Sequence, residues 1–398
     1  MKTIAILDPT STDPKSSVRG IGRCLQTMKE SLNNEPVSNS GERPVSQFSD
    51  RPISQHDNLY FNYLPNVTSL RKDMIFVNPF YNPVQMHVKI KEKHIKRIAI
   101  IHDLIPLKFK DHFPTGFRGM WNNYWNKRDI KKYDRIITVS DTSKKDIISI
   151  YNISSEKISV IYPTVIGLFL PHLDTSLEGP GHHHPFHVEN NVVLPEFTRL
   201  PLNMISSNEQ VRSLKDFAIY VGDATWNKNL PNLARAIKMT NITCVFVGKV
   251  FGDVQHKPIP KKTHPWEKSL YEFMQIAQND PHFIFPGYVS DLELKLLYSH
   301  AKINMLVSYD EGFGYSYVEA GYMSTPSILA DTPIFHEIAG EAATFANPHD
   351  PKDIAQKMNE LYYDGIHHEK MSIRAFDRAQ KYNPHKFQQD WFDVLSVI

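Results

Sequence analysis

The stretch INMLVSYDEGFGYSYVEAGYMSTPSILAD, residues 303–331, decides the fold class of this chain. It opens with an apolar run, INMLVS (303–308), and closes with a second run, PSILAD (326–331). A glycine loop at 309–314 and a helical pattern that begins near Tyr315 lie between them. Continuous apolar runs bounded by polar residues are typical of strands buried on both faces of a parallel sheet. The stretch therefore predicts a strand, a crossover helix and a second parallel strand.

Runs of the same kind recur along the chain. They predict strands at 3–8, 73–79, 97–103, 135–140, 158–163, 217–223, 243–249 and 283–288. Helical patterns alternate with them, including one at 141–151 that Ser140 can cap. This repetition predicts the α/β class, with two Rossmann-like, doubly wound parallel sheets. Ligands of such sheets bind at the carboxyl ends of the strands, so we expect the active site in a central cleft that the two domains face.

The alternation stops at residues 166–215, which carry several prolines and the run GHHHPFH (181–187). We expect a linker or insertion there, and a solvated loop rather than a metal site at the histidines, because no matched ligands stand elsewhere. Residues 33–58 also have the composition of a long loop. The predicted organisation is an N-terminal domain at 1–165, the linker at 166–215, a C-terminal domain at 216–383 and a last helix at 384–398.

Length and composition are ordinary for a soluble protein of two domains. The 398 residues are 41% hydrophobic and 22% charged. No apolar run reaches the roughly 18 residues that a transmembrane helix needs. The opening MKTIAILDPT is interpreted as a first strand, not as a secretory signal. Cys24 and Cys244 form no CxxC pair, so we expect a reducing, cytoplasmic location.

Charge is shared unevenly between the two halves. Residues 1–165 carry 25 Lys and Arg against 16 Asp and Glu, a net +9, and the remainder carries 20 against 27, a net −7. Solvated helix faces explain this equally well as a basic face on the N-terminal domain that meets an anionic membrane. Trp121, Tyr124 and Trp125, just before the basic stretch at 126–135, suit a membrane interface. No nucleic-acid motif accompanies the charge, so no nucleic-acid partner is expected.

Two glutamates flank the glycine loop of the opening stretch. Glu311 precedes Gly312 and Gly314, and Glu319 stands eight positions after Glu311, about one turn inside the predicted helix. Free N–H groups at the start of a helix bind anions, and a carboxylate accepts hydrogen bonds from a pair of sugar hydroxyls. We therefore interpret the helix start as a pyrophosphate site, one glutamate as a hexose ligand and the other as a ribose ligand. The alternative is that these acids only stabilise the helix dipole.

The same stretch resembles the E-x7-E element of glycosyltransferase family 4, retaining enzymes of the GT-B fold. Further segments resemble that family in the same order: RGIGR (19–23), IHDLIPLKF (101–109), the strand–helix–strand stretch at 133–163, FPGYVSDLELKLLYSHA (285–301) and the stretch at 337–358. The resemblance implies retaining transfer of a hexose from a nucleotide-diphosphate sugar to a glycan or lipid-linked glycan. A lipid-linked acceptor at the inner membrane face would suit the positive charge of residues 1–165. GDP-mannose is the favoured donor, because the HDLIP segment is similar to bacterial mannosyltransferases of surface polysaccharides, and UDP-hexoses come second.

Site roles follow from the resemblance residue by residue. It implies two catalytic residues, Glu311 against the hydroxyls of the donor sugar and His102 near that sugar, although His102 also fits a core histidine at a strand end. Glu319 would bind the nucleotide ribose. The implied donor contacts are Gly20, Gly22, Lys228, Gly312, Phe313, Gly314, Tyr315 and Glu319, with Arg23 as a further phosphate contact. Neither a metal nor another cofactor is expected, and the nucleotide sugar is a substrate.

One segment departs from the family pattern. In VGDATWNKNLPNL (221–233) Lys228 stands, but Asp223 and Asn227 occupy places that are often basic in the family. The resemblance implies an Arg and a Lys that together bind the diphosphate, and this departure weakens that expected contact. It keeps open a degenerate, non-catalytic module that binds nucleotide sugars. A glycoside hydrolase with Glu311 and Glu319 as acid and base is a further alternative.

The last helix has an apolar stripe of its own. Phe387, Trp391 and Leu395 recur at intervals of four residues. Packing within the C-terminal domain explains the stripe, but the resemblance implies that this helix returns to the N-terminal domain. We expect the second arrangement.

Overall fold

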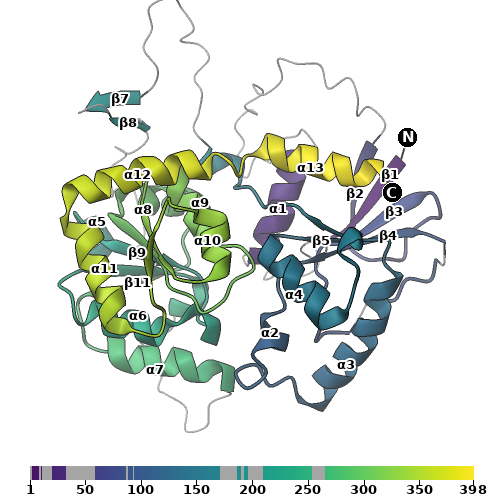
Figure 1. The fold of residues 1–398 in the computed structure, drawn as a ribbon, viewed down its shortest axis with the longest axis horizontal. Helices are drawn as coiled ribbons and strands as arrows, with labels where there is room; N and C mark the ends of the chain where they lie inside the picture. Colours follow the sequence, from purple (N-terminus) through teal and green to yellow (C-terminus); the bar gives the residue numbers. More distant parts are fainter. Residues whose placement is uncertain are drawn as a thin grey trace, which may run out of the picture. The chain divides into compact units, whose positions relative to one another are not determined.

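The structure, a computed structural model, divides the chain into two units. It describes residues 2–8, 10, 20–32, 59–86, 88–92, 94–170, 186–189, 192–195, 209–252 and 265–398. The first unit is formed by Met1–Gly167 with Tyr382–Ile398, and the second by Leu168–Lys381 (Figure 1). Most of the predicted histidine run at 181–187 and the predicted loop at 33–58 lie outside the described residues.

The first unit is built on a six-stranded parallel sheet. Its strands are β1 (Lys2–Leu7), β2 (Leu59–Leu64), β3 (Met74–Asn78), β4 (Lys96–Ile101), β5 (Arg135–Thr138) and β6 (Ile158–Val160), in the order β2-β1-β3-β4-β5-β6. All five residues of β3 are buried, which is why this strand is apolar along its whole length. The order reverses between β1 and β3.

Helices cover this sheet. They are α1 (Gly20–Leu32), α2 (Ile105–Lys108), α3 (Gly116–Asp129), α4 (Asp141–Tyr151) and α13 (Pro384–Ser396), with short 3-10 turns at Ile130–Lys132 and Ser155–Lys157. The cap predicted for α4 is present, because Ser140 Oγ accepts from the backbone N–H of Ser143 at 3.0 Å. The helix α1 already begins at Gly20, so Gly20 and Gly22 lie in its first turn.

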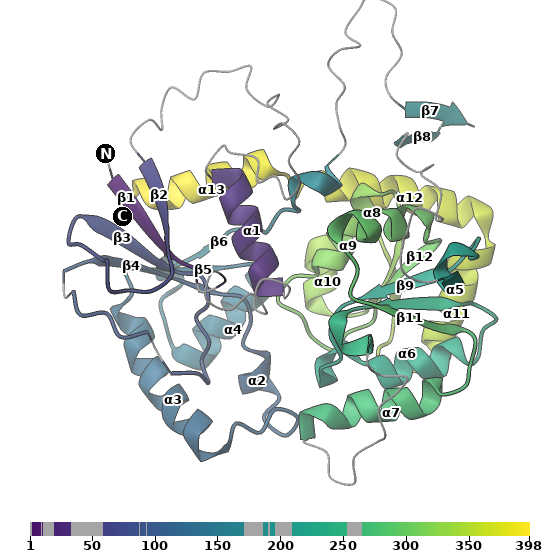
Figure 2. The same ribbon diagram turned by 180° about the vertical axis from the view of Figure 1, so that it is seen from behind.

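The second unit has its own six-stranded parallel sheet (Figure 2). Its strands are β9 (Ala218–Val221), β10 (Cys244–Val247), β11 (Phe283–Gly287), β12 (Ile303–Leu306), β13 (Ser327–Ala330) and β14 (Thr344–Ala346), in the order β11-β10-β9-β12-β13-β14. A separate antiparallel hairpin joins β7 (Phe186–Glu189) and β8 (Val192–Pro195). The predicted α/β class with two parallel sheets is therefore confirmed.

Eight helices of the described residues accompany the second sheet. They are α5 (Glu209–Arg212), α6 (Leu230–Ile237), α7 (Lys268–Ala277), α8 (Asp291–His300), α9 (Tyr315–Tyr322), α10 (Pro333–Ala339), α11 (Pro351–Tyr363) and α12 (Gly365–Ala379), with 3-10 turns at Gly167–Phe169, Trp226–Lys228, Lys249–Phe251 and Pro265–Glu267. One core cluster joins sheet and helices, and its aromatic centre is Phe246 on β10, whose ring contacts those of Phe251, Phe273 and Phe283.

The strand order of the second sheet positions a ligand site. After β9 the chain proceeds to β10 on one side, and after β12 it proceeds to β13 on the other. The loops that follow β9 and β12 therefore lead in opposite directions, and the place between these two strands is the switch point of the sheet. Open α/β sheets bind ligands at such a point, beyond the carboxyl ends of the strands.

The helix α13 belongs to the first unit. Its Gln388 Nε2 donates to the backbone oxygen of Ser31 at 2.9 Å, and the ring of Phe392 lies 6.4 Å from that of Phe61 on β2. Trp391, on the apolar stripe noted in the sequence, is 1% exposed. No helix among the described residues is both long and apolar enough to span a membrane.

Candidate functional site

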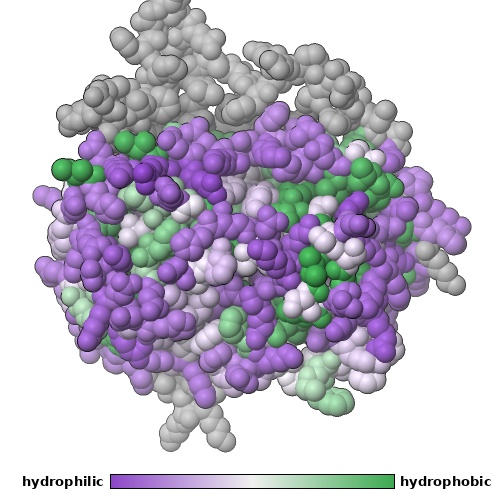
Figure 3. Space-filling model, viewed as in Figure 1, coloured by the Kyte–Doolittle hydropathy of each residue, from purple (hydrophilic) through white to green (hydrophobic). Residues whose placement is uncertain are grey.

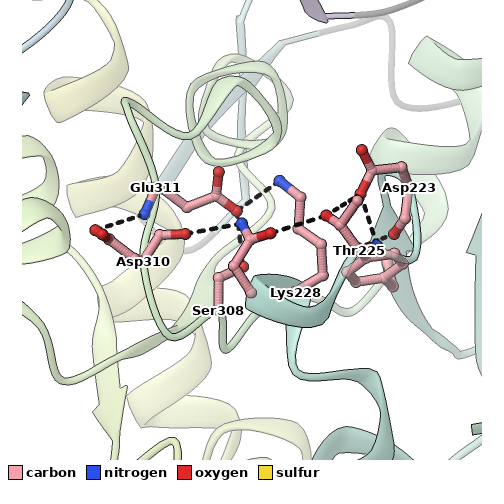
Figure 4. A network of polar contacts seen from close by, with 8 residues as sticks. Asp223, Thr225, Lys228, Ser308, Asp310 and Glu311 are labelled. Atoms are coloured by element: carbon pink, nitrogen blue, oxygen red, sulfur yellow. Dashed lines mark hydrogen bonds and ion pairs between the residues drawn. The ribbon is translucent and has the colours of Figure 1, made fainter. Parts of the chain in front are cut away.

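An ion pair lies at the switch point of the second sheet. Lys228, in the loop after β9, places its Nζ atom 2.7 Å from Oε1 of Glu311, in the loop after β12 (Figure 4). The two side chains are 19% and 11% exposed. Sequence analysis selected both residues separately, and the fold brings them together across 83 positions of the chain.

A polar turn holds Lys228 in place. The Asp223 carboxylate accepts hydrogen bonds from the backbone N–H and the hydroxyl of Thr225, at 3.1 and 2.8 Å. Thr225 in turn accepts the backbone N–H of Lys228 at 2.9 Å. Asn229 then adopts a left-handed conformation with φ of 58° and starts α6. The carboxylate of Asp223 thus organises the turn that carries the lysine.

Glu311 is oriented by its own loop. Ser308 Oγ donates to Oε1 of Glu311 at 2.7 Å, so that this oxygen accepts from both a hydroxyl and an ammonium group. The backbone N–H of Glu311 donates to Oδ1 of Asp310 at 3.0 Å. Ser308, which sequence analysis did not select, lies two residues after β12 at the end of the predicted run 303–308, and its hydroxyl at that place was the available signal.

Asn227 ties the two loops to each other. Its backbone oxygen accepts the N–H of Tyr309 at 2.7 Å, and its side-chain amide donates to the backbone oxygen of Asp310 at 3.0 Å. The residue is 5% exposed, and its amide oxygen lies 2.8 Å from Thr225 Oγ1, whose single proton is shared between this oxygen and the Asp223 carboxylate. The position at which the resemblance led us to expect a basic residue thus holds a buried amide that hydrogen-bonds to the neighbouring loop.

The glycine loop leads into α9. Gly314 has φ of +123°, and a Cβ atom there would lie 3.3 Å from Leu306 Cδ2 and 3.3 Å from Phe335 Cε1. A side chain there would be strained by the backbone conformation and would crowd both neighbours. Phe313 is buried, and its ring meets that of Tyr315, the first residue of α9, edge to face at 5.5 Å.

Glu319 has a different environment from Glu311. It lies within α9, is 3% exposed, and accepts a hydrogen bond from the hydroxyl of Tyr298 on α8 at 3.2 Å. The two glutamates therefore differ in setting, because Glu311 belongs to the polar loop network and Glu319 to the contact between two helices.

A stack of three rings borders the same loops. The ring of Tyr309 stacks on that of Trp226 at 4.9 Å and on that of His349 at 4.9 Å. Asn232 donates to the Tyr309 hydroxyl at 3.0 Å. Sequence analysis did not find this stack, since its members come from three separate loops.

The remaining predicted residues belong to the first unit. His102 follows β4, and its Nε2 atom lies 3.2 Å from the backbone oxygen of Pro79, so Nε2 carries the proton when the ring is neutral. Burial lowers the pKa of His102 below its ordinary value, which favours that neutral form. Gly20, Gly22 and Arg23 all lie in the first turn of α1, and Arg23 is half-buried.

Within the described part of the chain, no three His, Cys, Asp or Glu side chains gather as a metal site would require. The paired groups at the centre of the site are the ammonium of Lys228, the carboxylate of Glu311 and the hydroxyl of Ser308, and the backbone N–H groups at the start of α9 follow in the same loop. Such a set suits a ligand that carries both hydroxyls and a diphosphate.

Two family models match the chain. The model described as Glycosyltransferase Family 4 matches residues 33–166, and the model described as Glycosyl transferases group 1 matches residues 205–378. The second match contains Lys228, Glu311 and α9.

Characterised relatives are similar at modest identity. The O-antigen chain mannosyltransferase RfbU of Salmonella typhimurium is 27% identical over 252 residues, which cover 63% of this chain and 57% of RfbU. The serotype-specific mannosyltransferase WbdA of Escherichia coli is 21% identical over 80% of this chain, but over only 36% of WbdA. The chain thus spans about half or less of the length of these two relatives.

Solved structures are similar along the whole chain. Alr3699/HepE of Anabaena, in complex with UDP and glucose, covers 100% of both chains with a TM-score of 0.63 and 14% identity. Sucrose-phosphate synthase of Thermosynechococcus elongatus covers 100% of this chain and 98% of its own, with a TM-score of 0.60 and 13% identity. At this identity the likeness concerns the fold alone.

Proposed function

The chain belongs to the glycosyltransferases that join a family 4 domain to a group 1 domain, and we propose that it transfers mannose from GDP-mannose to a glycan. The GT-B fold that the resemblance implied is confirmed by the two parallel sheets and by the structural neighbours. The proposed reaction is retaining and uses no metal.

The observation that carries the proposal is the Lys228–Glu311 pair at the switch point. In a nucleotide sugar, the anomeric bond joins the hexose, which carries the hydroxyls, to the diphosphate. An ammonium and a carboxylate 2.7 Å apart can therefore bind the two parts that this bond connects, the ammonium the diphosphate and the carboxylate the hydroxyls. On donor binding, Lys228 would turn to a phosphate oxygen and Glu311 to sugar hydroxyls, so that each exchanges its present partner for a charged or polar one.

The reaction then needs stabilisation of the leaving group. The bond between the anomeric carbon and the diphosphate oxygen breaks, and the diphosphate keeps the electron pair. An acceptor hydroxyl attacks from the same face and gives its proton to the departing phosphate oxygen. Lys228 and the N–H groups of Gly312 to Tyr315 would stabilise the negative charge, a role for which no metal is required. Glu319 is assigned to the ribose and His102 to the donor sugar.

Mannose is proposed because RfbU and WbdA are named mannosyltransferases. UDP-hexoses are the second choice, because HepE was solved with UDP and glucose. A lipid-linked glycan at the inner membrane face is the proposed acceptor, and it agrees with the basic character of residues 1–165.

A screen of radiolabelled nucleotide sugars with a membrane extract as acceptor tests this function. We expect label to enter the extract from GDP-mannose, with release of GDP, undiminished by a chelator, and in the α-configuration of the donor. Incorporation from a UDP-hexose alone would show that the donor is that UDP-hexose and not GDP-mannose. Free mannose without incorporation would indicate hydrolysis, and a β-linked product would exclude retention.

A non-catalytic binding module is the second candidate. It is favoured by Asp223 and Asn227, whose side chains are engaged within the loops and add no positive charge for a diphosphate. Calorimetry with GDP, followed by the transfer assay, separates the two functions. Binding of GDP without turnover of any donor would support the module.

A further inference from the structure

The helix α3 of the first unit exposes its large apolar side chains on its outer face. Five of the fourteen large hydrophobic side chains that are exposed on the described residues lie on it: Phe117 at 83%, Met120 at 65%, Trp121 at 56%, Tyr124 at 50% and Trp125 at 42%. Their spacing of three, one, three and one positions forms one stripe along a helix. Figure 3 shows white and light green surface at the lower end of α3, among hydrophilic atoms.

Asparagines, not apolar residues, hold the inner face of α3. Asn126 is 1% exposed, and its Nδ2 atom lies 2.8 Å from the backbone oxygen of Pro83 and 2.7 Å from that of Gln85. Asn122 donates to the backbone oxygen of Val84 at 3.1 Å. These hydrogen bonds fix the rotation of the helix about its axis, so that the aromatic stripe faces outward.

The exposed rings form a continuous surface. The ring centroids of Trp121 and Trp125 are 6.0 Å apart, and the ring of Tyr124 lies 6.4 Å from Trp121 and 5.6 Å from Trp125. The guanidinium of Arg128 lies 3.8 Å from the centre of the Tyr124 ring, which places a cation beside the aromatic rings.

Positive charge surrounds the stripe. Residues 116–132 carry Arg118, Lys127, Arg128, Lys131 and Lys132 against the single acid Asp129. Asp129 is buried and faces Lys132 at 3.6 Å. Beyond the helix, a hollow of about 620 Å³ is lined by Lys89, Lys96, Arg97 and Lys132 against Asp129 and Asp134, so its charge is also positive on balance. Lys96 is paired with Asp134 at 3.1 Å.

We propose that the aromatic stripe of α3 docks on the surface of an anionic phospholipid membrane. Tryptophan and tyrosine favour the level of the lipid headgroups, and surrounding lysine and arginine are attracted to anionic lipids. A second copy of the chain is a poorer occupant, because pairing two such faces would oppose like charges. The inference extends the proposed lipid-linked acceptor and rests on it for its purpose, but membrane docking is measurable without catalysis.

Cosedimentation with vesicles tests the proposal in the absence of any nucleotide sugar. The full chain is mixed with vesicles of phosphatidylcholine, with or without about one third phosphatidylglycerol. We expect binding to the anionic vesicles only, and a large loss of binding at about 0.5 M salt, where charges are screened. Trp121→Ala combined with Trp125→Ala should weaken binding at least roughly tenfold.

The matched control removes one exposed hydrophobic residue from each of two other helices, α11 and α12. Tyr363 and Ile366 are 59% and 84% exposed. The double variant Tyr363→Ala and Ile366→Ala should bind vesicles as the wild type does. Quenching of tryptophan fluorescence by brominated lipids should be strong in the wild type and weak in the Trp121/Trp125 variant.

Several outcomes would overturn the proposal. These are absence of vesicle binding, equal binding by the Trp121/Trp125 variant, or equal binding to neutral vesicles. Self-association of the wild type that the Trp121/Trp125 variant abolishes, without vesicle binding, would assign the stripe to contact between copies. GDP affinity, measured by calorimetry on the same samples, shows separately whether the donor site is intact, so that failure of docking is not confused with failure of the proposed function.

Discussion

Lys228 and Glu311 compensate each other's charge. Both are largely buried, and removing one member of a buried pair leaves an uncompensated charge. A substitution at either position must therefore be checked for an effect of the partner charge that it leaves uncompensated.

Glu311→Gln keeps the shape of the side chain and removes its charge. We expect transfer to fall by about two to three orders of magnitude, because a charged hydrogen bond to the reacting sugar is lost. Affinity for GDP should stay near that of the wild type. Steady-state transfer and calorimetry measure the two effects, with the exposed Glu369→Gln as control. Wild-type turnover in Glu311→Gln would remove this residue from the site.

Lys228→Ala should weaken binding of GDP more than binding of guanosine, since the ammonium is assigned to phosphate. Lys228→Arg keeps a cation and should recover part of the lost affinity. Calorimetry with the two ligands gives the comparison. An equal loss for GDP and guanosine would mean that Lys228 supports the loops and not the diphosphate.

His102 makes stability depend on pH. Its folded-state pKa is lowered by burial, so the folded state binds fewer protons than the unfolded state as pH falls through about 6.5. Its contribution to stability is thus full above that pH and is lost as pH falls towards the lowered pKa. Urea unfolding at about pH 7.5 and about pH 5.5 should show a smaller loss for His102→Gln than for the wild type. The exposed His385→Gln is the control, and an unchanged pH dependence in His102→Gln would contradict this account.

At the scale of elements, the turn into α9 depends on one glycine. Gly314→Ala would place a Cβ atom at φ of +123° and within 3.3 Å of two side chains. We expect a loss of about 1–3 kcal/mol in the free energy of unfolding, together with lower transfer activity. Gly365→Ala, at the start of α12, is the matched control, because a Cβ atom there meets nothing within 4 Å. Equal stability of the two variants in thermal unfolding would contradict the argument.

Buried parallel strands were predictable because their apolar runs are continuous. β3, β4, β12 and β13 all lie within their predicted ranges, apart from the first residue of β4. β2 was missed because its half-buried residues, LYFNYL, form no such run, and β14 because it has only three residues. α3 was missed because its apolar face points outward.

The site was predictable residue by residue, but its partnerships were not. Glu311 and Lys228 stand in recognisable motifs, whereas their ion pair depends on the order of strands in the sheet. The role of Asn227 was equally hidden, because an asparagine in a loop gives no signal that its amide fastens a second loop 83 positions away.

At the scale of the whole molecule, α13 contributes to the first unit. Trp391→Ala would leave a cavity at a residue that is 1% exposed, and we expect a loss of about 3–5 kcal/mol. Hydrogen exchange should rise in α1 and β2, and stay unchanged in β12 and α9. Val397→Ala, 67% exposed near the end of the same helix, should have no effect. Increased exchange in the second unit as well would mean that the two units unfold together.

The return of residues 382–398 to the first unit also sets an order of events during synthesis. The ribosome makes the whole of residues 168–381 before it makes α13. The second unit can therefore complete its core on the nascent chain while the first, although begun earlier, still lacks the helix that covers α1 and β2. Until α13 emerges, the surface that receives Trp391 remains open to solvent and to chaperones.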